Sequence, residues 1–309
     1  MAPQHSFRGT FAILGTCFHD DERIDYESQE NLINYCIDNG LHGLVTGANA
    51  SEGHLMLDEE KKALTAFVIQ KVNGRIPVVV TVNHPSSYCA AQLARQAEEA
   101  GAAAVMCMPP FFGRWRSGLG EIESYFTAID KAINIPIILQ DHQLSDISLP
   151  VDFLANLSSR LENLKYIKLE SGNIIHKARK LLAHPKNNLV GVFGGNSGVF
   201  LPEEYEAGCC GTMPACYMPA EFSNTWNLLE EGKMQEAVNY FAPYSRLAAY
   251  EKDVANRCLW KEILVKKGVI RSSKVRGPEP AFFEPWDVDQ LLSVAAAAGI
   301  ELPLNESIL

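Results

Sequence analysis

The sequence predicts an α/β fold: a closed (β/α)8 TIM barrel followed by a C-terminal helical extension. Short apolar runs of β-forming residues recur eight times at fairly even spacing, and segments of helical periodicity lie between them. The length of 309 residues, 47% of them hydrophobic, is sufficient for one large core. Strand followed by helix, repeated eight times, is typical of a parallel barrel with its helices outside. A doubly wound open sheet is the second possibility, but no GxGxxG motif follows the first strand.

The elements follow from these patterns in chain order. The expected strands are residues 11–16, 43–47, 77–82, 103–108, 136–140, 166–170, 190–194 and 211–214. The expected helices between them are residues 26–39, 59–73, 87–100, 122–132, 151–158, 174–184 and 203–207. In the first of these helices an apolar stripe is formed by Leu32, Ile33, Cys36 and Ile37. The last two strand–helix units are compressed, so the strand count is weakest there.

The chain beyond the eighth strand is helical in character. Residues 220–230, 233–267 and 288–298 are expected to form helices, with three prolines between the last two segments. No linker or low-complexity segment separates a second domain. We therefore expect residues 1–219 to form the barrel and residues 220–309 to pack on it as part of a single structural unit.

Composition excludes several classes of function. The net charge is −10 and the pI about 5.3, and no cluster of Lys and Arg suggests nucleic acid binding. The basic residues between 266 and 276 are interpreted as a solvated face. The eight cysteines show no CxxC spacing, which favours reduced core thiols. Residues 1–10 lack the apolar core of a secretory signal, and no run approaches 18 apolar residues. These features predict a cytoplasmic protein without a membrane partner.

The sixth expected strand carries the main chemical candidate. Lys168 and Glu170 are two residues apart near its end, so both side chains are expected to face the same cavity. A lysine at the mouth of an apolar strand can lose its proton near neutral pH and act as an amine nucleophile. A neighbouring carboxylate can transfer protons. The alternative is a strand-end lysine that reaches to solvent.

The carboxyl ends of the other strands supply the remaining candidates, because function in such barrels lies at that face. The residues there are rich in hydroxyl, amide and glycine groups, which suits a small anionic substrate. They include Thr16, 49–52, Asn83, His84, 109–112, 140–142, 194–198 and Met213. Lys168 is the only lysine at these positions.

Several motifs, in order and spacing, resemble the family of dihydrodipicolinate synthase and N-acetylneuraminate lyase. They are residues 43–60 with Ser51-Glu52-Gly53, 108–112 (Met-Pro-Pro-Phe-Phe), 136–139 (Pro-Ile-Ile-Leu), 166–168 (Tyr-Ile-Lys), 194–196 (Gly-Gly-Asn) and 208–212. The resemblance covers almost the whole chain. It implies a Schiff-base aldolase, lyase or dehydratase on a barrel with C-terminal helices, and it places Lys168 where the family keeps its Schiff-base lysine. It also implies a homotetramer built as a dimer of dimers.

Departures from the two parent enzymes narrow the function. The proton-shuttling tyrosine expected after the fifth strand is replaced by Gln140, and the aromatic pair Phe111-Phe112 lacks a hydroxyl. The paired threonines that hold the substrate carboxylate are replaced by Asn49 and Ala50. An arginine expected a few residues past the fifth strand is missing. A role in lysine biosynthesis is therefore not expected.

The altered set is similar to the bacterial L-2-keto-3-deoxyarabonate dehydratase subfamily. This resemblance implies that Lys168 forms an imine with a 2-keto-3-deoxy sugar acid, that Glu170 acts as general base and acid, and that Gln140 orients a hydroxyl or a water. We expect the substrate to be bound by Asn49, Ser51, Asn196 and Ser197, with Phe111 at the same mouth. No metal and no organic cofactor is implied.

Each candidate has a structural alternative. Glu170 could only position Lys168, Gln140 could cap a strand end, and Ser51 with Glu52 could cap the next helix, Glu52 being interpreted as structural. Asn196 and Ser197 could be turn residues between glycines. A surface or capping role is preferred for His84 and His142, and Asp141 is a weak catalytic candidate.

Three functions remain open from the sequence. The dehydratase is favoured, and an aldolase that releases pyruvate from a 2-keto-3-deoxy acid shares its imine. The third is a barrel that binds a keto acid without catalysis. The presence of both Lys168 and Glu170 argues against the last.

Overall fold

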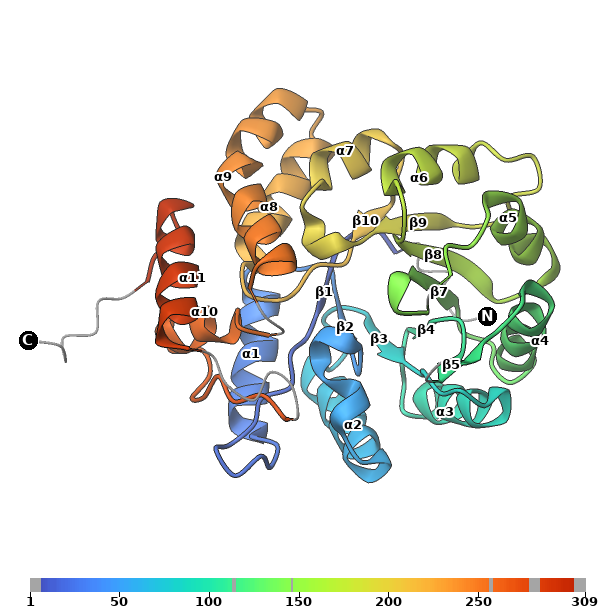
Figure 1. The fold of residues 1–309 in the computed structure, drawn as a ribbon, viewed down its shortest axis with the longest axis horizontal. Coiled ribbons are helices and arrows are strands. Elements are labelled where there is room, and N and C mark those ends of the chain that lie inside the picture. The colour runs from blue at the N-terminus through green and yellow to red at the C-terminus, as the bar shows by residue number, and fades with distance from the viewer. Residues whose placement is uncertain (1–6, 113–114, 146, 256–257, 278–283, 303–309) are drawn as a thin grey trace, which may run out of the picture.

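The computed structural model describes residues 7–112, 115–145, 147–255, 258–277 and 284–302. The predicted (β/α)8 barrel is confirmed. Eight parallel strands close into a ring in the order β1-β10-β9-β8-β7-β4-β3-β2, with helices around it (Figure 1). The strands are β1 (Gly9–Ile13), β2 (Gly43–Thr46), β3 (Val78–Thr81), β4 (Ala104–Cys107), β7 (Ile137–His142), β8 (Leu164–Glu170), β9 (Gly191–Gly194) and β10 (Gly211–Thr212).

The helices outside the ring lie where the periodicity predicts them. They are α1 (Tyr26–Asp38), α2 (Asp58–Val72), α3 (Ser87–Glu99), α4 (Leu119–Asp130), α5 (Val151–Arg160), α6 (Ile174–Leu182) and α7 (Leu201–Glu206). Helix α1 begins after Asp25, whose side chain accepts the N–H groups of Glu27 and Ser28 and so satisfies two donors that the helix leaves unpaired. Among the helices in these ranges, none combines the length and apolar character needed to cross a membrane.

A short hairpin was not predicted. Strands β5 (Phe111–Phe112) and β6 (Trp115–Arg116) pair antiparallel after β4. Their two-residue length is too short for a period-2 pattern to be recognised in the sequence.

Four helices follow the barrel: α8 (Pro219–Glu230), α9 (Met234–Asp253), α10 (Lys261–Lys266) and α11 (Pro285–Ala297). The expectation of one helical segment over residues 233–267 is wrong. Helix α9 ends at Asp253, and Cys258 has φ of +58°, a left-handed backbone that a right-handed helix cannot contain. Helix α8 packs beside β1, and α9 packs against both α8 and α11. The division at residue 219 stays a prediction.

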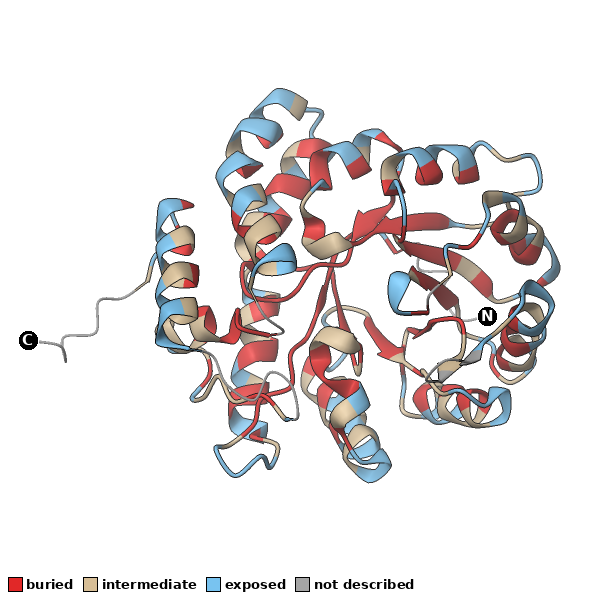
Figure 2. Ribbon diagram, viewed as in Figure 1, coloured by how far each residue is buried: buried red, intermediate tan, exposed pale blue. Residues whose placement is uncertain are grey.

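The barrel strands are largely buried (Figure 2). Aromatic and aliphatic side chains fill the interior. Phe11, Tyr166 and Phe193 meet there, with ring centroids 5.2 Å apart for Phe11–Phe193 and 5.7 Å for Tyr166–Phe193. Because side chains alternate along a strand, the next inward position on β8 after Tyr166 is Lys168. This aromatic cluster therefore fills the barrel interior below Lys168.

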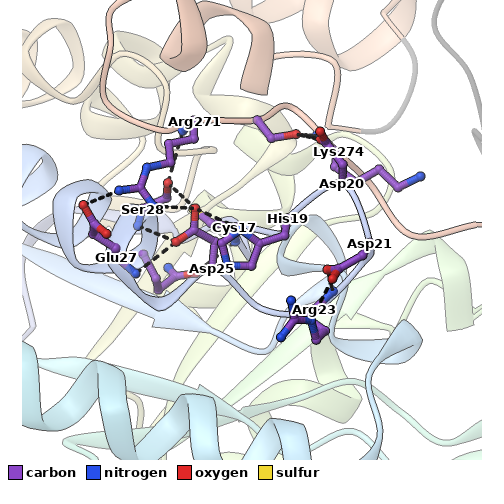
Figure 3. Close-up of polar contacts among 12 residues, drawn as sticks. Cys17, His19, Asp20, Asp21, Arg23, Asp25, Glu27, Ser28, Arg271 and Lys274 are labelled. Atoms are coloured by element: carbon purple, nitrogen blue, oxygen red, sulfur yellow. Dashed lines mark hydrogen bonds and ion pairs between the residues drawn. The ribbon is translucent and has the colours of Figure 1, made fainter.

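The basic residues after α10 pair with acidic residues of the first strand–helix unit, and Arg271 remains exposed, as expected of a solvated face. Figure 3 shows Arg271 and Lys274 beside the loop between β1 and α1. Arg271 pairs with Glu27 and lies 4.0 Å from Asp25, while Lys274 lies 3.2 Å from Glu22. These contacts hold the C-terminal segment on the first strand–helix unit. All eight cysteines lie within the described ranges and are free thiols, seven of them buried.

A buried ion pair joins the C-terminal helices to the barrel mouth. The Lys261 ammonium, 1% exposed, binds the carboxylate of Glu52, and the Arg276 backbone N–H donates to the same carboxylate at 2.8 Å. Glu52 itself has φ of +57°, so this contact fixes the loop after β2 in an unusual conformation. Glu52 is thus a structural residue, as interpreted from the sequence.

We expect Lys261→Met to destabilise the protein by about 3–5 kcal/mol, because it leaves the Glu52 carboxylate buried without its cation. Urea unfolding of the variant and the wild type measures the difference. Lys61→Met, which removes only the exposed pair with Asp58, is the matched control and should unfold near the wild-type midpoint. Equal midpoints for all three proteins would contradict the assignment.

Candidate functional site

The candidate site lies at the carboxyl end of β8. Tyr166, Lys168 and Glu170 alternate along this strand and face inward, while Ile167 and Leu169 pack outward into the larger core. Lys168 is 2% exposed, so the amine is surrounded by protein on nearly every side. The alternative of a lysine that reaches to solvent does not fit this burial.

Gln140 joins the two β8 residues from the neighbouring strand. It lies opposite Lys168 in the β7–β8 register. Its amide Nε2 donates to Glu170 Oε2 at 2.6 Å, while Lys168 Nζ lies 3.2 Å from Glu170 Oε1. Glu170 is thus held from both sides, and each of its oxygens has a donor. The Oε1 atom of Gln140 has no partner among the described residues and remains available to a ligand.

The charge state of Glu170 follows from these neighbours. Burial raises the pKa of this carboxyl, but the positive charge of Lys168, the proximity of His142 and the Gln140 hydrogen bond outweigh burial and hold the pKa below its usual range. Glu170 is therefore ionised at neutral pH. A carboxylate this close to an amine can accept protons from that amine or from a molecule bound to it.

His142 is a neighbour of this group. It lies opposite Glu170 in the register, and its Nδ1 accepts the Leu144 N–H at 2.9 Å. Burial lowers the pKa of His142, with Glu170 opposing and Lys168 reinforcing the change, so the ring is neutral. The capping role expected for His142 fits this contact.

Asp141 is structural. Its side chain faces outward from β7, where it binds the Lys177 ammonium of α6, accepts the Ser171 hydroxyl at 2.5 Å and accepts the Leu149 N–H at 3.0 Å. These bonds occupy both carboxylate oxygens on the side of the strand away from Lys168. The weak catalytic assignment of Asp141 is therefore wrong.

Ser51 and Asn49 lie on the opposite side of the ring. They form a short 3-10 turn, Asn49–Ser51, directly after β2, and β2 is four strands from β8 in the closed order. The Thr16 hydroxyl donates to the Ser51 carbonyl at 2.5 Å and Asn49 Nδ2 contacts Met108 Sδ at 3.7 Å. The Ser51 hydroxyl is buried and unpaired within the described chain. Neither residue caps α2, which begins at Asp58, seven residues after Ser51.

Asn196 and Ser197 follow β9, the strand next to β8. Both have positive φ, 51° and 57°, as turn residues do. Gly195 precedes them, and a Cβ at this position would collide with Cγ of Glu170. The glycine is thus required for Glu170 to fit, and the loop that carries Asn196 and Ser197 runs past the candidate base. No described hydrogen bond joins these two residues to Lys168.

Phe111 lies elsewhere. It lines a cavity of about 490 Å³ beside α3 and α4, with Tyr125 and Ser117 among the other lining residues. The structure does not bring Phe111 into contact with Lys168, Glu170 and Gln140 in any described interaction. Its assignment to the substrate mouth stays a prediction.

Comparisons with known proteins identify the family of this chain. Residues 6–292 match the model of the dihydrodipicolinate synthetase family. The chain belongs to this family. It is therefore a lyase, and the resemblance read from the sequence motifs is confirmed at the level of the family.

Individual relatives differ in their reactions. The chain is 31% identical over 294 residues to L-2-keto-3-deoxyarabonate dehydratase of Azospirillum brasilense, covering 95% of this chain and 94% of that protein. It is 28% identical over 248 residues to 4-hydroxy-tetrahydrodipicolinate synthase of Clostridium perfringens strain SM101, with 78% and 82% coverage. The crystal structure of dihydrodipicolinate synthase from Rhodopseudomonas palustris superimposes with a TM-score of 0.85 at 28% identity, covering 94% of this chain and 98% of the other.

One acidic residue near the site was missed by sequence reasoning. Glu204 of α7 is 1% exposed and lies behind the end of β9. The available signal was its position: Leu201, Glu204 and Ala207 are three residues apart and share the face of the helix that packs inward. An acidic residue on the apolar face of a helix indicates a buried carboxyl group.

We expect Gln140→Leu to raise the pKa of Glu170, because the amide donor stabilises only the charged carboxylate. NMR titration of protein labelled at the glutamate carboxyl carbons measures this directly. Glu230 of α8, whose pKa is lowered mainly by its hydrogen bond from Arg8, provides the internal reference and should titrate as before. An unchanged Glu170 titration would show that the 2.6 Å contact does not stabilise the charge.

Proposed function

We propose that this protein is a Schiff-base dehydratase of a 2-keto-3-deoxy sugar acid. The observation that carries the proposal is the buried group of Lys168, Glu170 and Gln140, in which one carboxylate is held 3.2 Å from the amine and 2.6 Å from the amide. Within the family, the similarity to the Azospirillum dehydratase over 95% of the chain supports the same choice.

The reaction would begin at the amine. Glu170 accepts a proton from the Lys168 ammonium, and the neutral amine attacks the C2 carbonyl of the keto acid. The carbonyl oxygen then leaves as water, taking one proton from the amine and the proton held by Glu170, and a protonated imine remains that acidifies the C3 hydrogens. The positive charge stays on the lysine nitrogen, and Glu170 is again a carboxylate beside the reacting carbons.

Glu170 would then serve both proton transfers of the elimination of water. As its carboxylate it removes a proton from C3, and the C3 electrons form an enamine. As its acid it returns the proton to the C4 hydroxyl, which leaves as water while the enamine electrons form the C3–C4 double bond. The double bond then moves from C3–C4 to C4–C5, as C5 loses a proton and C3 gains one, and the resulting enol becomes an aldehyde. Hydrolysis of the imine frees Lys168 and gives a dioxo acid.

Gln140 favours dehydration over carbon–carbon cleavage. Aldol cleavage requires a base at the C4 hydroxyl, a task that the parent enzymes' tyrosine can perform and an amide cannot. Here the amide donates to Glu170, and its free Oε1 can accept a hydrogen bond from a substrate hydroxyl. One carboxylate that alternates between base and acid is sufficient for loss of water.

The loop after β2 is suited to the substrate carboxylate. It lies across the ring from Lys168, which supports binding of the carboxylate there while the carbonyl carbon reaches the amine. The buried Ser51 hydroxyl has its hydrogen free for an anion, and Asn49 adds an amide donor. Asn196 and Ser197, on the β9 side, would contact the hydroxyl-bearing carbons.

The assembly and location implied by the resemblance remain proposals. We propose a homotetramer, arranged as a dimer of dimers, that works in the cytoplasm on its small keto acid. The family resemblance supports both.

Borohydride trapping with 2-keto-3-deoxyarabonate followed by intact-mass measurement tests the chemistry. We expect a wild-type adduct that has lost the substrate's C4 hydroxyl, and no adduct for Lys168→Ala, since the amine is removed. Lys165→Ala on the same strand is the matched control. Glu170→Gln should still form the imine but dehydrate about 10²–10⁴-fold more slowly.

Other adduct masses would contradict the proposal. A pyruvate-sized adduct would identify an aldolase, and the absence of any adduct would leave a barrel that binds keto acids without an imine. An adduct at full yield in Lys168→Ala would place the nucleophile elsewhere.

We expect Ser51→Ala to lower kcat/KM by about 10- to 100-fold, the loss of one hydrogen bond to a charged group. The effect should appear mainly in KM, because the carboxylate is bound equally in the ground and transition states. Steady-state kinetics measures it, with the exposed Ser159→Ala as control. Unchanged KM in Ser51→Ala would remove this loop from the substrate site.

A further inference from the structure

Glu204 is a buried acid that the proposed reaction does not use. It lies on α7 and is 1% exposed, and neither carboxyl oxygen has a hydrogen-bond partner within the described ranges. An unpaired carboxylate in such a place is costly, so the group must be uncharged or must serve a purpose that offsets the cost. The position of Glu204 in the fold decides between these two possibilities.

Two successive glycines at the end of β9 separate Glu204 from Glu170. A Cβ on Gly194 would collide with the carboxyl carbon of Glu204, and a Cβ on Gly195 would collide with Cγ of Glu170. The backbone of this glycine pair is therefore packed between the two glutamates. Glu204 lies behind the strand and Glu170 lies in front of it, at the mouth.

Polar and charged groups around Glu204 come from each neighbouring element. Thr212 on β10 lies opposite Gly194 in the register, and its hydroxyl also has no partner in the described part of the chain. Glu170 on β8, Glu203 on α7 itself and Cys209 before β10 are the titratable groups that interact with Glu204. No cation is among these neighbours.

This environment keeps the proton on Glu204. Burial raises the pKa of Glu204 to about 8, and the charges of Glu170 and Glu203 add to the rise, against the Thr212 hydroxyl and the Gly195 N–H, which lower it. Neither of these two groups reaches full hydrogen-bond geometry with the carboxyl. The acid is thus neutral at pH 7 while Glu170 is ionised.

We propose that Glu204 is a positioning residue that acts, uncharged, through the Gly194–Gly195 backbone on Glu170. The inference rests on the proposed function, in which Glu170 alternates between base and acid. A neutral neighbour leaves Glu170 a strong enough acid to protonate the departing hydroxyl. A negative charge on Glu204 would raise the proton affinity of Glu170 and slow this second transfer, while imine formation at Lys168 would continue.

The experiment compares the wild type with two variants that cannot ionise, Glu204→Gln and Glu204→Met, over pH 6 to 9.5. We expect wild-type kcat to fall by roughly 3- to 10-fold above pH 8, because a like charge weakens the acid. KM and the yield of borohydride-trapped imine should change little over this range. Both variants should keep a flat kcat there. Glu203→Gln, one residue away on the exposed side of α7, should show the wild-type decrease at a slightly lower pH, because loss of its charge lowers the pKa of Glu204.

Unfolding in urea provides a readout that does not depend on activity. An unfolded glutamate loses its proton near pH 4.5, whereas folded Glu204 keeps it to about pH 8. Between these values the folded state binds more protons, so the stability that the bound proton confers falls as pH rises and then levels off. The two Glu204 variants should lack this decrease, and Glu203→Gln should retain it.

Each result decides the inference. A kcat decrease shared equally by wild type and Glu204→Gln, or unfolding curves with the same pH dependence, would overturn it. A folded but inactive Glu204→Gln would show that the acid itself transfers a proton, and would also overturn the positioning role. Absence of turnover by the wild type at every pH would defeat the proposed function and the coupling with it, while the unfolding curves would still identify Glu204 as the titrating group.

Discussion

The ion pair between Lys168 and Glu170 is the interaction on which the rest of the site depends. Both side chains point into the mouth of a closed barrel above an aromatic floor, where two charges are expensive unless each is paired and hydrogen-bonded. Gln140 completes the pairing by donating to the second carboxylate oxygen. The same arrangement that makes this burial tolerable also places an amine, a proton acceptor and an amide within reach of one carbon chain.

Barrel closure produces this geometry from residues far apart in sequence. Parallel register aligns Gln140 with Lys168, and the side-chain period of two returns Glu170 to the same face. Gly195, directly after β9, has no side chain and therefore leaves the volume that Glu170 occupies. Outward positions on the same strands serve stability, as Asp141 does through Lys177 of α6. Function and stability are thus divided between alternate residues of one strand.

Most of the fold and the central pair of the site could be predicted because they follow from local patterns. Alternation identified Lys168 and Glu170 as neighbours, and the barrel rule selected the strand ends. The contacts that could not be predicted join distant parts of the chain. Glu52 is bound by a lysine 209 residues away, and the outward partner of Asp141 lies 36 residues away on another element. The break between α9 and α10 likewise depends on backbone dihedrals that apolar periodicity does not encode.

Replacing a shuttle tyrosine by Gln140 changes what the site can do with protons. A phenol can pass protons along a relay, whereas an amide only fixes the position of the groups it binds. In the proposed dehydration all proton transfer is then concentrated on Glu170, whose acid strength must suit both removal from C3 and return to the hydroxyl. Such a carboxylate is sensitive to every charge nearby, and the barrel places one other buried glutamate, without a partner in the described chain, directly behind it. Because the tyrosine is lost, the proposed reaction requires Glu204 to stay neutral. The two glycines between the glutamates are the backbone segment through which Glu204 acts on Glu170.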